Sequence, residues 1–476
     1  MSHNRREFIK RTGIAGISIA GAGIINGCAN PSKESNLDEI RRQSARNFNQ
    51  QFNMSGYAAP KIDLVRIGVI GLGNRGPGAV ERINHIEGVE IKALGDIRPE
   101  RVEKVQRKLE GSRHQPISFA GSENAWKELC ERYHIDLVYI ATPWQLHTPM
   151  ALYAMEQGKH AAVEIPAATT VEECWQLVET SERTKKHCMM LENTCYDFFE
   201  MLVLNMTRQG FFGEIIHGEG AYIHTLIDSH NFSKDYYSDM WRLKENYRNG
   251  SLYPTHGLGP ICQVMNINRG DQLDYLSSMS SNDFQMGETA HKLAAEDDFY
   301  KEFAGKNFRG NINTTSIRTK NGRTIMIQHD VTSPRPYSRI HLVSGTKGIA
   351  RKYPEPAKIA TGHDDWVTQE EFSVLEEKYT PELTKKLGEM ARQIGGHGGM
   401  DFLMDWRLID CLRNGLPLDQ DVYDAAAWSV VAPLSEWSVA NRSNSIDVPD
   451  FTAGAWKNNK PVDISLRGGG TTKVII

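Results

Sequence analysis

Val65-Arg-Ile-Gly-Val-Ile-Gly-Leu-Gly-Asn-Arg-Gly76 is the stretch that decides the fold of this chain. Its short apolar run is typical of a buried strand, which leads directly into Gly71-x-Gly73-x-x-Gly76 and a segment that can form a helix. Glycines in this arrangement let the backbone turn tightly and approach a pyrophosphate, which binds at the helix N-terminus. A second apolar run ends at Asp96, about 20 residues further on, where a carboxylate can accept hydrogen bonds from a ribose. The pattern predicts a bound dinucleotide.

Asp96 also bears on which dinucleotide binds. Its negative charge repels a 2′-phosphate, so NAD is favoured over NADP, whereas Arg98 close by favours the opposite. We therefore expect NAD as the cofactor.

Strands and helices alternate from residue 61 to residue 193. Helices are predicted at 98–109, 124–133 and 149–158, and Thr170-x-x-Glu173 is a capping box that opens another. Between them lie apolar strands at 137–142, 160–165 and 188–193. This alternation predicts a doubly wound parallel sheet, in which ligands bind beyond the carboxyl ends of the strands. The residues expected at that edge are Asn74, Arg75, Asp96, Pro143, Trp144, Gln145, Leu146, His147, Glu164 and Asn193.

Residues 194–476 are expected to form a second α/β domain. Segments 218–224, 324–330 and 339–344 are predicted strands, and helices are predicted at 400–413 and 423–440. Tyrosine, tryptophan and histidine crowd the segment 222–256, and aromatic rings of this kind stack on sugar faces. The alternative is a small satellite of the hydrophobic core under a long loop, and the sequence leaves both open.

The first 28 residues are expected to be an export signal. Arg5-Arg6 precedes the uncharged, mostly apolar stretch 13–25, which is too short to span a bilayer. This pattern favours a twin-arginine (Tat) signal over an ordinary secretory one, and Ile25-Asn26-Gly27-Cys28 resembles a lipobox that would lipidate Cys28. A periplasmic or membrane-anchored protein is expected. Residues 29–60 are polar and are predicted to be a tether.

The composition argues against several other classes of function and of site. The net charge is −4 with both signs interspersed, so no nucleic-acid partner is expected. The seven cysteines form no CxxC pair, and no HExxH or Cys/His cluster is present, so neither a disulfide framework nor a metal site is expected. A homo-oligomeric state stays open.

Three motifs resemble the Gfo/Idh/MocA oxidoreductase family: Gly71-Leu-Gly-Asn-Arg-Gly76, Ala141-Thr-Pro-Trp-Gln-Leu-His147 and His160-Ala-Ala-Val-Glu-Ile-Pro166. The resemblance implies a Rossmann domain followed by an α/β domain with a large, open, mostly antiparallel sheet. Many of these dehydrogenases carry Glu-Lys-Pro, whose lysine assists removal of the substrate hydroxyl proton. Here the triplet is Glu164-Ile165-Pro166, so that lysine is absent.

Further motifs resemble glycoside hydrolase family 109, a family of NAD-dependent α-N-acetylgalactosaminidases. They include Glu192-Asn-Thr-Cys-Tyr196, Gly218-Glu-Gly-Ala-Tyr222, Met240-Trp-Arg242, Tyr253-Pro-Thr-His-Gly257, Arg335-Pro-Tyr337 and Gly396-His-Gly-Gly-Met-Asp401. The resemblance implies a glycan partner carrying terminal N-acetylgalactosamine. It implies NAD contacts at Asn74, Arg75, Asp96, Trp144 to His147, Glu164, Ile165, Asn193, Arg242 and Tyr253. It implies sugar contacts at Tyr222, Tyr253, Pro254, Thr255, His256 and Tyr337.

The chemistry implied by the family needs two proton-transfer groups. The sugar is transiently oxidised at C3, its C2 proton is removed, the C1 oxygen is eliminated, and water adds before C3 is reduced again. Histidine is suited to proton transfer near neutrality, which favours His256. Tyr196 could serve as a base if a nearby positive charge lowered its pKa. Which of them would act at C2 and which at C3 stays open. His147 and His224 are the alternative candidates for these two roles.

Two other function classes compete. A sugar dehydrogenase would leave its product oxidised, and a non-catalytic protein would bind a sugar while retaining NAD as a structural element.

Overall fold

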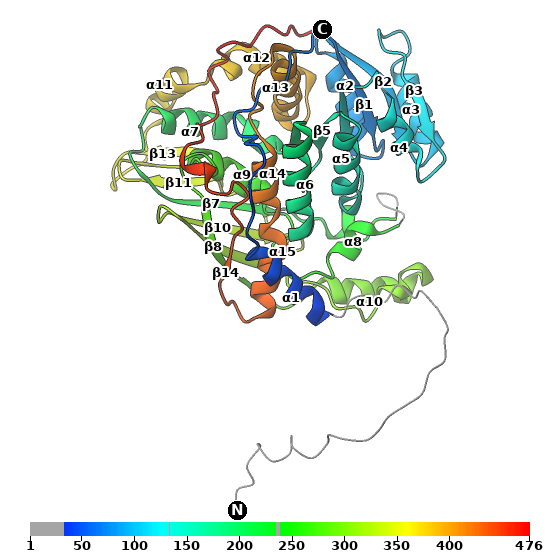
Figure 1. Ribbon diagram of the computed structural model, residues 1–476. Helices are drawn as coiled ribbons and strands as arrows, with labels where there is room; N and C mark the ends of the chain where they lie inside the picture. Colours follow the sequence, from blue (N-terminus) through cyan, green and yellow to red (C-terminus); the bar gives the residue numbers. More distant parts are fainter. Residues whose placement is uncertain (1–32, 133, 235–238) are drawn as a thin grey trace, which may run out of the picture.

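A computed structural model gives the fold and describes residues 33–132, 134–234 and 239–476 (Figure 1). The predicted signal at residues 1–28, including Cys28, lies outside the described residues and stays a prediction. Among the residues that are described, no helix is both long and apolar enough to cross a membrane.

The first domain is built on a six-stranded sheet in the order β3-β2-β1-β4-β5-β6, with every pair parallel. This is the order expected of a dinucleotide-binding fold, and the strand order reverses between β1 and β4. The strands are β1 (Val65–Ile70), β2 (Val89–Asp96), β3 (Ile117–Ala120), β4 (Leu137–Ile140), β5 (His160–Val163) and β6 (Cys188–Met190). The helices between them are α2 (Arg75–Asn84), α3 (Pro99–Lys108), α4 (Ala125–Glu131), α5 (His147–Glu156) and α6 (Val171–Thr184).

Short sequence signals explain where most of these helices begin. The Thr170 side chain caps α6, and the Glu173 side chain returns the bond to the Thr170 backbone, which is the predicted capping box. Helix α5 begins two residues earlier than predicted, since Pro149 lies in its first turn, where a missing N–H costs nothing.

The second domain contains an eight-stranded sheet in the order β13-β12-β11-β7-β10-β9-β8-β14. Within this second sheet, β7 and β10 pair in parallel and the other described strand pairs are antiparallel, so the sheet is mostly antiparallel, as expected. The strands are β7 (Ile215–Ile223), β8 (Leu273–Ser280), β9 (Ile312–Thr319), β10 (Thr324–Asp330), β11 (Leu342–Gly345), β12 (Ile349–Arg351), β13 (Lys358–Ala360) and β14 (Ile446–Asp447). Strand β11 begins later than predicted because Ile340 and His341 have positive φ angles.

Helices join the two sheets, which lie beside each other in Figure 1. Helix α14 contacts α6 and β6 of the first domain and α9 of the second, and α9 packs on β7. The predicted helix at 423–440 is divided into α14 and α15, because Pro433 cannot donate a hydrogen bond to Ser429. The helices of this domain are α7 (Phe198–Arg208), α8 (Trp241–Glu245), α9 (Thr255–Val264), α10 (Met286–Glu296), α11 (Gln369–Tyr379), α12 (Glu382–Ile394), α13 (Met400–Asn414), α14 (Val422–Ser429) and α15 (Val431–Ala440).

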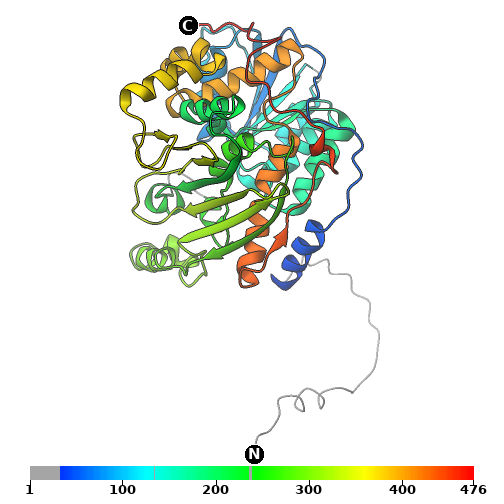
Figure 2. The same cartoon turned by 90° about the vertical axis from the view of Figure 1, so that its left-hand side faces the viewer.

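The predicted tether is wrong for the described residues 33–60. Residues Lys33–Ser44 form helix α1, which packs against α15 and α6, and the following segment runs along the body (Figure 2). Met54 is buried, and its backbone N–H donates to the Tyr423 hydroxyl at 3.1 Å. Although the segment is mostly polar, a few of its apolar side chains, Ile40 and Met54 among them, are buried against the folded body and hold the segment there.

Candidate active site

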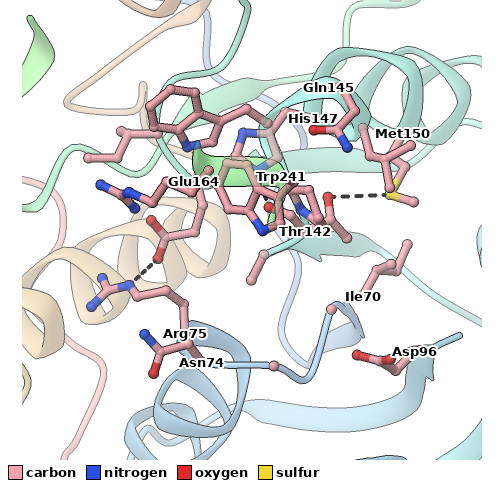
Figure 3. A pocket seen from close by; sticks show the side chains of 18 of the residues that line it. Ile70, Asn74, Arg75, Asp96, Thr142, Gln145, His147, Met150, Glu164 and Trp241 are labelled. Carbon is pink, nitrogen blue, oxygen red and sulfur yellow. Dashed lines mark hydrogen bonds and ion pairs between the residues drawn. The ribbon is translucent and has the colours of Figure 1, made fainter. Parts of the chain in front are cut away.

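A cavity of about 930 Å³ begins at the carboxyl ends of the parallel strands and continues to the second sheet. Such a volume is ample for a dinucleotide and a sugar ring. Figure 3 shows Arg75 and Glu164 at one side of the cavity and Asp96 at the other. The predicted residues that line it are Gly71, Gly73, Asn74, Arg75, Asp96, Trp144, Gln145, Leu146, His147, Glu164, Ile165, Asn193, Tyr222, Arg242, Tyr253 and His256.

The loop at residues 71–76, called the glycine loop from here on, cannot accommodate side chains at two of its positions. A Cβ on Gly71 would lie 2.4 Å from the Ala141 carbonyl oxygen, and the φ angle of Gly71 is +91°. A Cβ on Gly76 would lie 2.0 Å from the Gly71 carbonyl oxygen. Both contacts are with backbone, so no rotation of a side chain relieves them. Glycine is required here for the tight turn and for the close packing of α2, and the first turn of α2 opens onto the cavity.

Asp96 lies at the end of β2, where the sequence predicts a ribose acceptor. Its carboxylate accepts hydrogen bonds from the Leu72 N–H at 2.7 Å and the Arg98 N–H at 2.9 Å. Arg101 lies 3.7 Å from the same carboxylate. Asp96 therefore also holds the glycine loop in place.

Arg75 connects the glycine loop to the second domain. Its guanidinium donates to Glu164 at 2.8 Å (Figure 3) and to Asp401 at 3.2 Å. Burial acts to lower the pKa of Arg75, but the charges of Glu164 and Asp401 outweigh it and raise that pKa. Burial likewise acts to raise the pKa of Asp401, and the hydrogen bond from His397 and the nearby arginines lower it overall. Arg75 and Asp401 therefore stay charged, and their ion pair holds the first turn of α2 against α13.

Asn193 has a buried polar atom that no hydrogen-bonding group in the described part of the chain satisfies. Its amide nitrogen donates to Asp401 at 2.6 Å, whereas its buried Oδ1 has no hydrogen-bond partner among the described residues. Asn193 lines the cavity, so Oδ1 is available to a donor on a bound molecule. Together with the glycine loop, this acceptor fits a bound dinucleotide.

The end of the cavity that lies away from the glycine loop is lined by aromatic side chains. The Tyr253 ring stacks on Trp144 at 5.7 Å between centroids and lies 4.5 Å from Tyr222. The Arg242 guanidinium lies over both Trp144 and Tyr253. His256 meets Tyr222 and Tyr253 edge-on and is 13% exposed. A histidine thus lies between tyrosines on a wall that can contact a sugar.

His256 has a partner that the sequence pattern did not reveal. Its Nδ1 lies 2.7 Å from Glu192 Oε1, and the Glu192 side chain is fully buried. The two residues are far apart in the chain, and nothing in the spacing predicts their contact. The sequence signals for Glu192 are that it ends a predicted strand directly before Asn193 and begins one of the motifs shared with the family.

Two family models match this chain. One, described as "Oxidoreductase family, NAD-binding Rossmann fold", matches residues 65–192, and the other, "Glycosyl hydrolase 109, C-terminal domain", matches residues 196–458. The chain belongs to glycoside hydrolase family 109. Its first domain is an NAD-binding Rossmann domain, and NAD is its cofactor.

Relatives within family 109 match along nearly the whole chain. A "Glycosyl hydrolase family 109 protein" from Shewanella pealeana is 47% identical over 473 residues, which cover 98% of this chain and 99% of the relative. An "Alpha-N-acetylgalactosaminidase" from Shewanella oneidensis is 45% identical over 473 residues, with 97% and 99% covered. The solved structure of an NAD binding oxidoreductase from Klebsiella pneumoniae has the same fold at 16% identity, with a TM-score of 0.59 over 81% of this chain and 100% of that one.

The family 109 structure argues against one predicted catalytic residue, Tyr196. Its side chain is buried outside the cavity, and its hydroxyl donates to Asp419 at 3.2 Å. Burial raises the pKa of Tyr196 well above its ordinary value, the Asp419 charge adds to this, and Arg407 only partly opposes it. A tyrosine that serves as a base needs the opposite shift. We therefore correct the expectation and remove Tyr196 from the catalytic residues.

Replacing Tyr196 with phenylalanine should leave catalysis nearly intact. The change removes one hydrogen bond to Asp419, which keeps two bonds from Arg407. We expect the loss of one such bond to cost about 0.5–1.5 kcal/mol of stability. Thermal unfolding and steady-state hydrolysis of an aryl glycoside should show a lower Tm and a kcat within about threefold of the parent. A loss of activity at an unchanged Tm would restore Tyr196 to the mechanism.

Other predicted positions also lie away from the cavity in this family 109 chain. Pro254 and Thr255 begin α9 without lining the cavity, and Tyr337 accepts a hydrogen bond from Arg339 at 3.1 Å beside His224. His147 lines the cavity, but both of its ring nitrogens lie 2.7 Å from backbone carbonyl oxygens. Neither nitrogen of His147 is therefore available as a base, whereas His224 remains at the cavity.

Proposed function

We propose that this protein hydrolyses terminal α-linked N-acetylgalactosamine and that NAD takes part in the reaction. The observation that carries the proposal is the single cavity, which joins the glycine loop to the aromatic wall and His256 without a break. A cofactor at the loop and a sugar at the wall would then lie in contact. The relative from Shewanella oneidensis that is named an α-N-acetylgalactosaminidase supports the same substrate.

The first domain would hold the cofactor. The glycine loop and the first turn of α2 would take the pyrophosphate, Asp96 would take the adenosine ribose, and Asn193 Oδ1 would accept a hydrogen bond. Bound NAD supplies a reversible hydride acceptor for C3 of the sugar, so that no net oxidation results. Ile165 occupies the position where related dehydrogenases carry a lysine, and its apolar side chain cannot remove a proton.

The second domain would hold the sugar and move protons. Tyr222 and Tyr253 would pack on the ring, and Arg242 would bind polar groups or the cofactor at the junction. A ketone at C3 makes the C2 proton acidic, and loss of that proton expels the C1 oxygen. His256 is the cavity residue placed to take a proton, with Glu192 behind it. Whether it acts first at C2 or at the C3 hydroxyl is a question for isotope exchange.

Incubation of the purified holoenzyme with α- and β-linked aryl N-acetylgalactosaminides tests the proposal. We expect aryl alcohol release from the α-linked compound, with unoxidised N-acetylgalactosamine as the product. In deuterated water the product should carry deuterium at C2, because deprotonation there precedes elimination.

The alternatives give different results. Accumulating NADH with an oxidised sugar would indicate a dehydrogenase, and binding without turnover would indicate a sugar-binding protein. Hydrolysis without exchange at C2 would point to a conventional mechanism with two carboxylates.

A further inference from the structure

A buried carboxylate lies directly behind His256. The Glu192 side chain is 0% exposed, and its Oε1 lies 2.7 Å from His256 Nδ1. The same oxygen accepts hydrogen bonds from the Thr194 N–H at 3.2 Å and from the Thr194 hydroxyl at 2.8 Å. Three donors therefore converge on one oxygen. Such a carboxylate is held in one orientation before any substrate arrives.

The backbone around this pair leaves little freedom. Thr194 Oγ1 also lies 3.0 Å from the His256 carbonyl oxygen, so its one hydroxyl proton lies between this carbonyl and Glu192 and links the turn after β6 to the first turn of α9. A Cβ on Gly259 would lie 3.1 Å from Glu192 Cγ, and a Cβ on Gly257 would lie 2.3 Å from the Ala221 backbone nitrogen. The glycines that follow His256 therefore let α9 approach β7 on one side and Glu192 on the other.

The charge of Glu192 decides which histidine nitrogen carries the proton. Burial acts to raise the pKa of Glu192, but the positive charge of a protonated His256 ring and the hydrogen bonds from His256 and Thr194 lower it overall. An ionised carboxylate can only accept hydrogen bonds, so the proton of a neutral His256 ring must be on Nδ1. The other ring nitrogen, Nε2, then carries a lone pair, and it belongs to a side chain that lines the cavity.

We propose that Glu192 is the positioning residue of the reaction: it fixes the Nδ1-protonated tautomer of His256 and leaves Nε2 as the base. When Nε2 takes a proton from the sugar, the electron pair stays on the sugar atom and the ring becomes an imidazolium. Its positive charge lies against the Glu192 carboxylate, which stabilises it. The proton leaves Nε2 again in a later step. This inference rests on the proposed function, in which His256 moves a proton.

Glu192→Gln tests the role with almost no change in shape. Glutamine removes the negative charge that would stabilise the His256 imidazolium, while its amide oxygen takes the place of Oε1 because the Thr194 N–H donates there. We expect kcat to fall about 10²–10⁴-fold, with KM within a few-fold of the parent and bound NAD retained. The matched control is Glu182→Gln, since Glu182 is another buried glutamate but bonds Tyr423 and the N-terminal segment instead. Glu182→Gln should affect Tm and not kcat.

A double-mutant cycle distinguishes positioning from simple support of the fold. In a His256→Ala background, Glu192→Gln should change the residual kcat by less than about threefold, because Glu192 acts through the imidazole. An equal loss in both backgrounds, or a kcat near the parent value for Glu192→Gln alone, would overturn the inference. If His256→Ala were fully active, the proposed function itself would be contradicted, whatever the effect of Glu192→Gln.

Nuclear magnetic resonance of the unmutated protein gives a result even if the glutamine variant does not fold. The ¹⁵N signals of histidine-labelled holoenzyme can be assigned to His256 by their absence in His256→Ala. We expect the shifts of a neutral ring protonated at Nδ1. A ring protonated at Nε2 would contradict the role of Glu192.

Discussion

Replacing His256 with alanine should lower kcat for hydrolysis of an α-N-acetylgalactosaminide by about 10²–10⁴-fold, the usual cost of losing one general acid/base group. His256 is the histidine that lines the cavity between two tyrosines and is backed by a buried carboxylate. It is not part of the glycine loop, so the purified variant should still contain NAD. Steady-state kinetics, combined with mass spectrometry of the denatured supernatant, measures both quantities on the same sample.

The control for this change is His291→Ala, which removes an exposed histidine from α10. It should match the parent in both activity and NAD content. If His256→Ala kept near-normal kcat, the proton would be moved by another cavity residue, and His224 would be the next to test.

Replacing Gly76 with alanine should yield protein without NAD and without measurable hydrolysis. The new Cβ would lie 2.0 Å from the Gly71 carbonyl oxygen, which is far inside van der Waals contact and cannot be relieved by a side-chain rotation. Either the glycine loop or α2 must move, and in both cases the amides that would bind the pyrophosphate lose their arrangement. The nucleotide content of the purified variant measures the effect directly.

Gly78→Ala is the matched control, since it introduces the same methyl group one half-turn further along α2. There the Cβ would meet only the end of the Arg82 side chain at 3.3 Å, and alanine favours a helix. Retained NAD in both variants would mean that the dinucleotide does not bind at this loop.

Local signals were enough to predict the first domain. The capping box at Thr170, the glycine loop and the alternation of apolar runs each act within a few residues, and together they predicted the doubly wound parallel sheet. The rule that ligands bind beyond the carboxyl ends of the strands placed residues after the strands at the cavity. This was right for Asn193, whereas Tyr196, which was named as a base for the chemistry that the family implies, lies outside it. The reason is the 3₁₀ turn Asn193–Tyr196, which directs its first residue into the cavity and its last toward Asp419.

Long-range contacts were not predictable in the same way. The pairing of Glu192 with His256 depends on the close approach of α9 to the turn after β6, which only the folded chain brings about. The N-terminal segment was misjudged for a similar reason, because its polar composition gave no indication that Tyr423 and Glu182 would bind its backbone. Composition reports average solubility, whereas a few specific bonds decide whether a segment is held.

Helix α1 and the C-terminal residues each pack against the folded body and help to hold the two domains together. The C-terminal residues return to the first domain, where Ile475 N–H donates to the His85 carbonyl at 2.8 Å and Val474 pairs with Ile86. The N-terminal helix α1 in turn packs on α15 of the second domain. If the chain were cut between the domains, each fragment would lack a segment that packs on its surface. We therefore expect the two domains to unfold cooperatively. A hybrid that carries the Rossmann domain of another oxidoreductase would have to keep both chain ends as well.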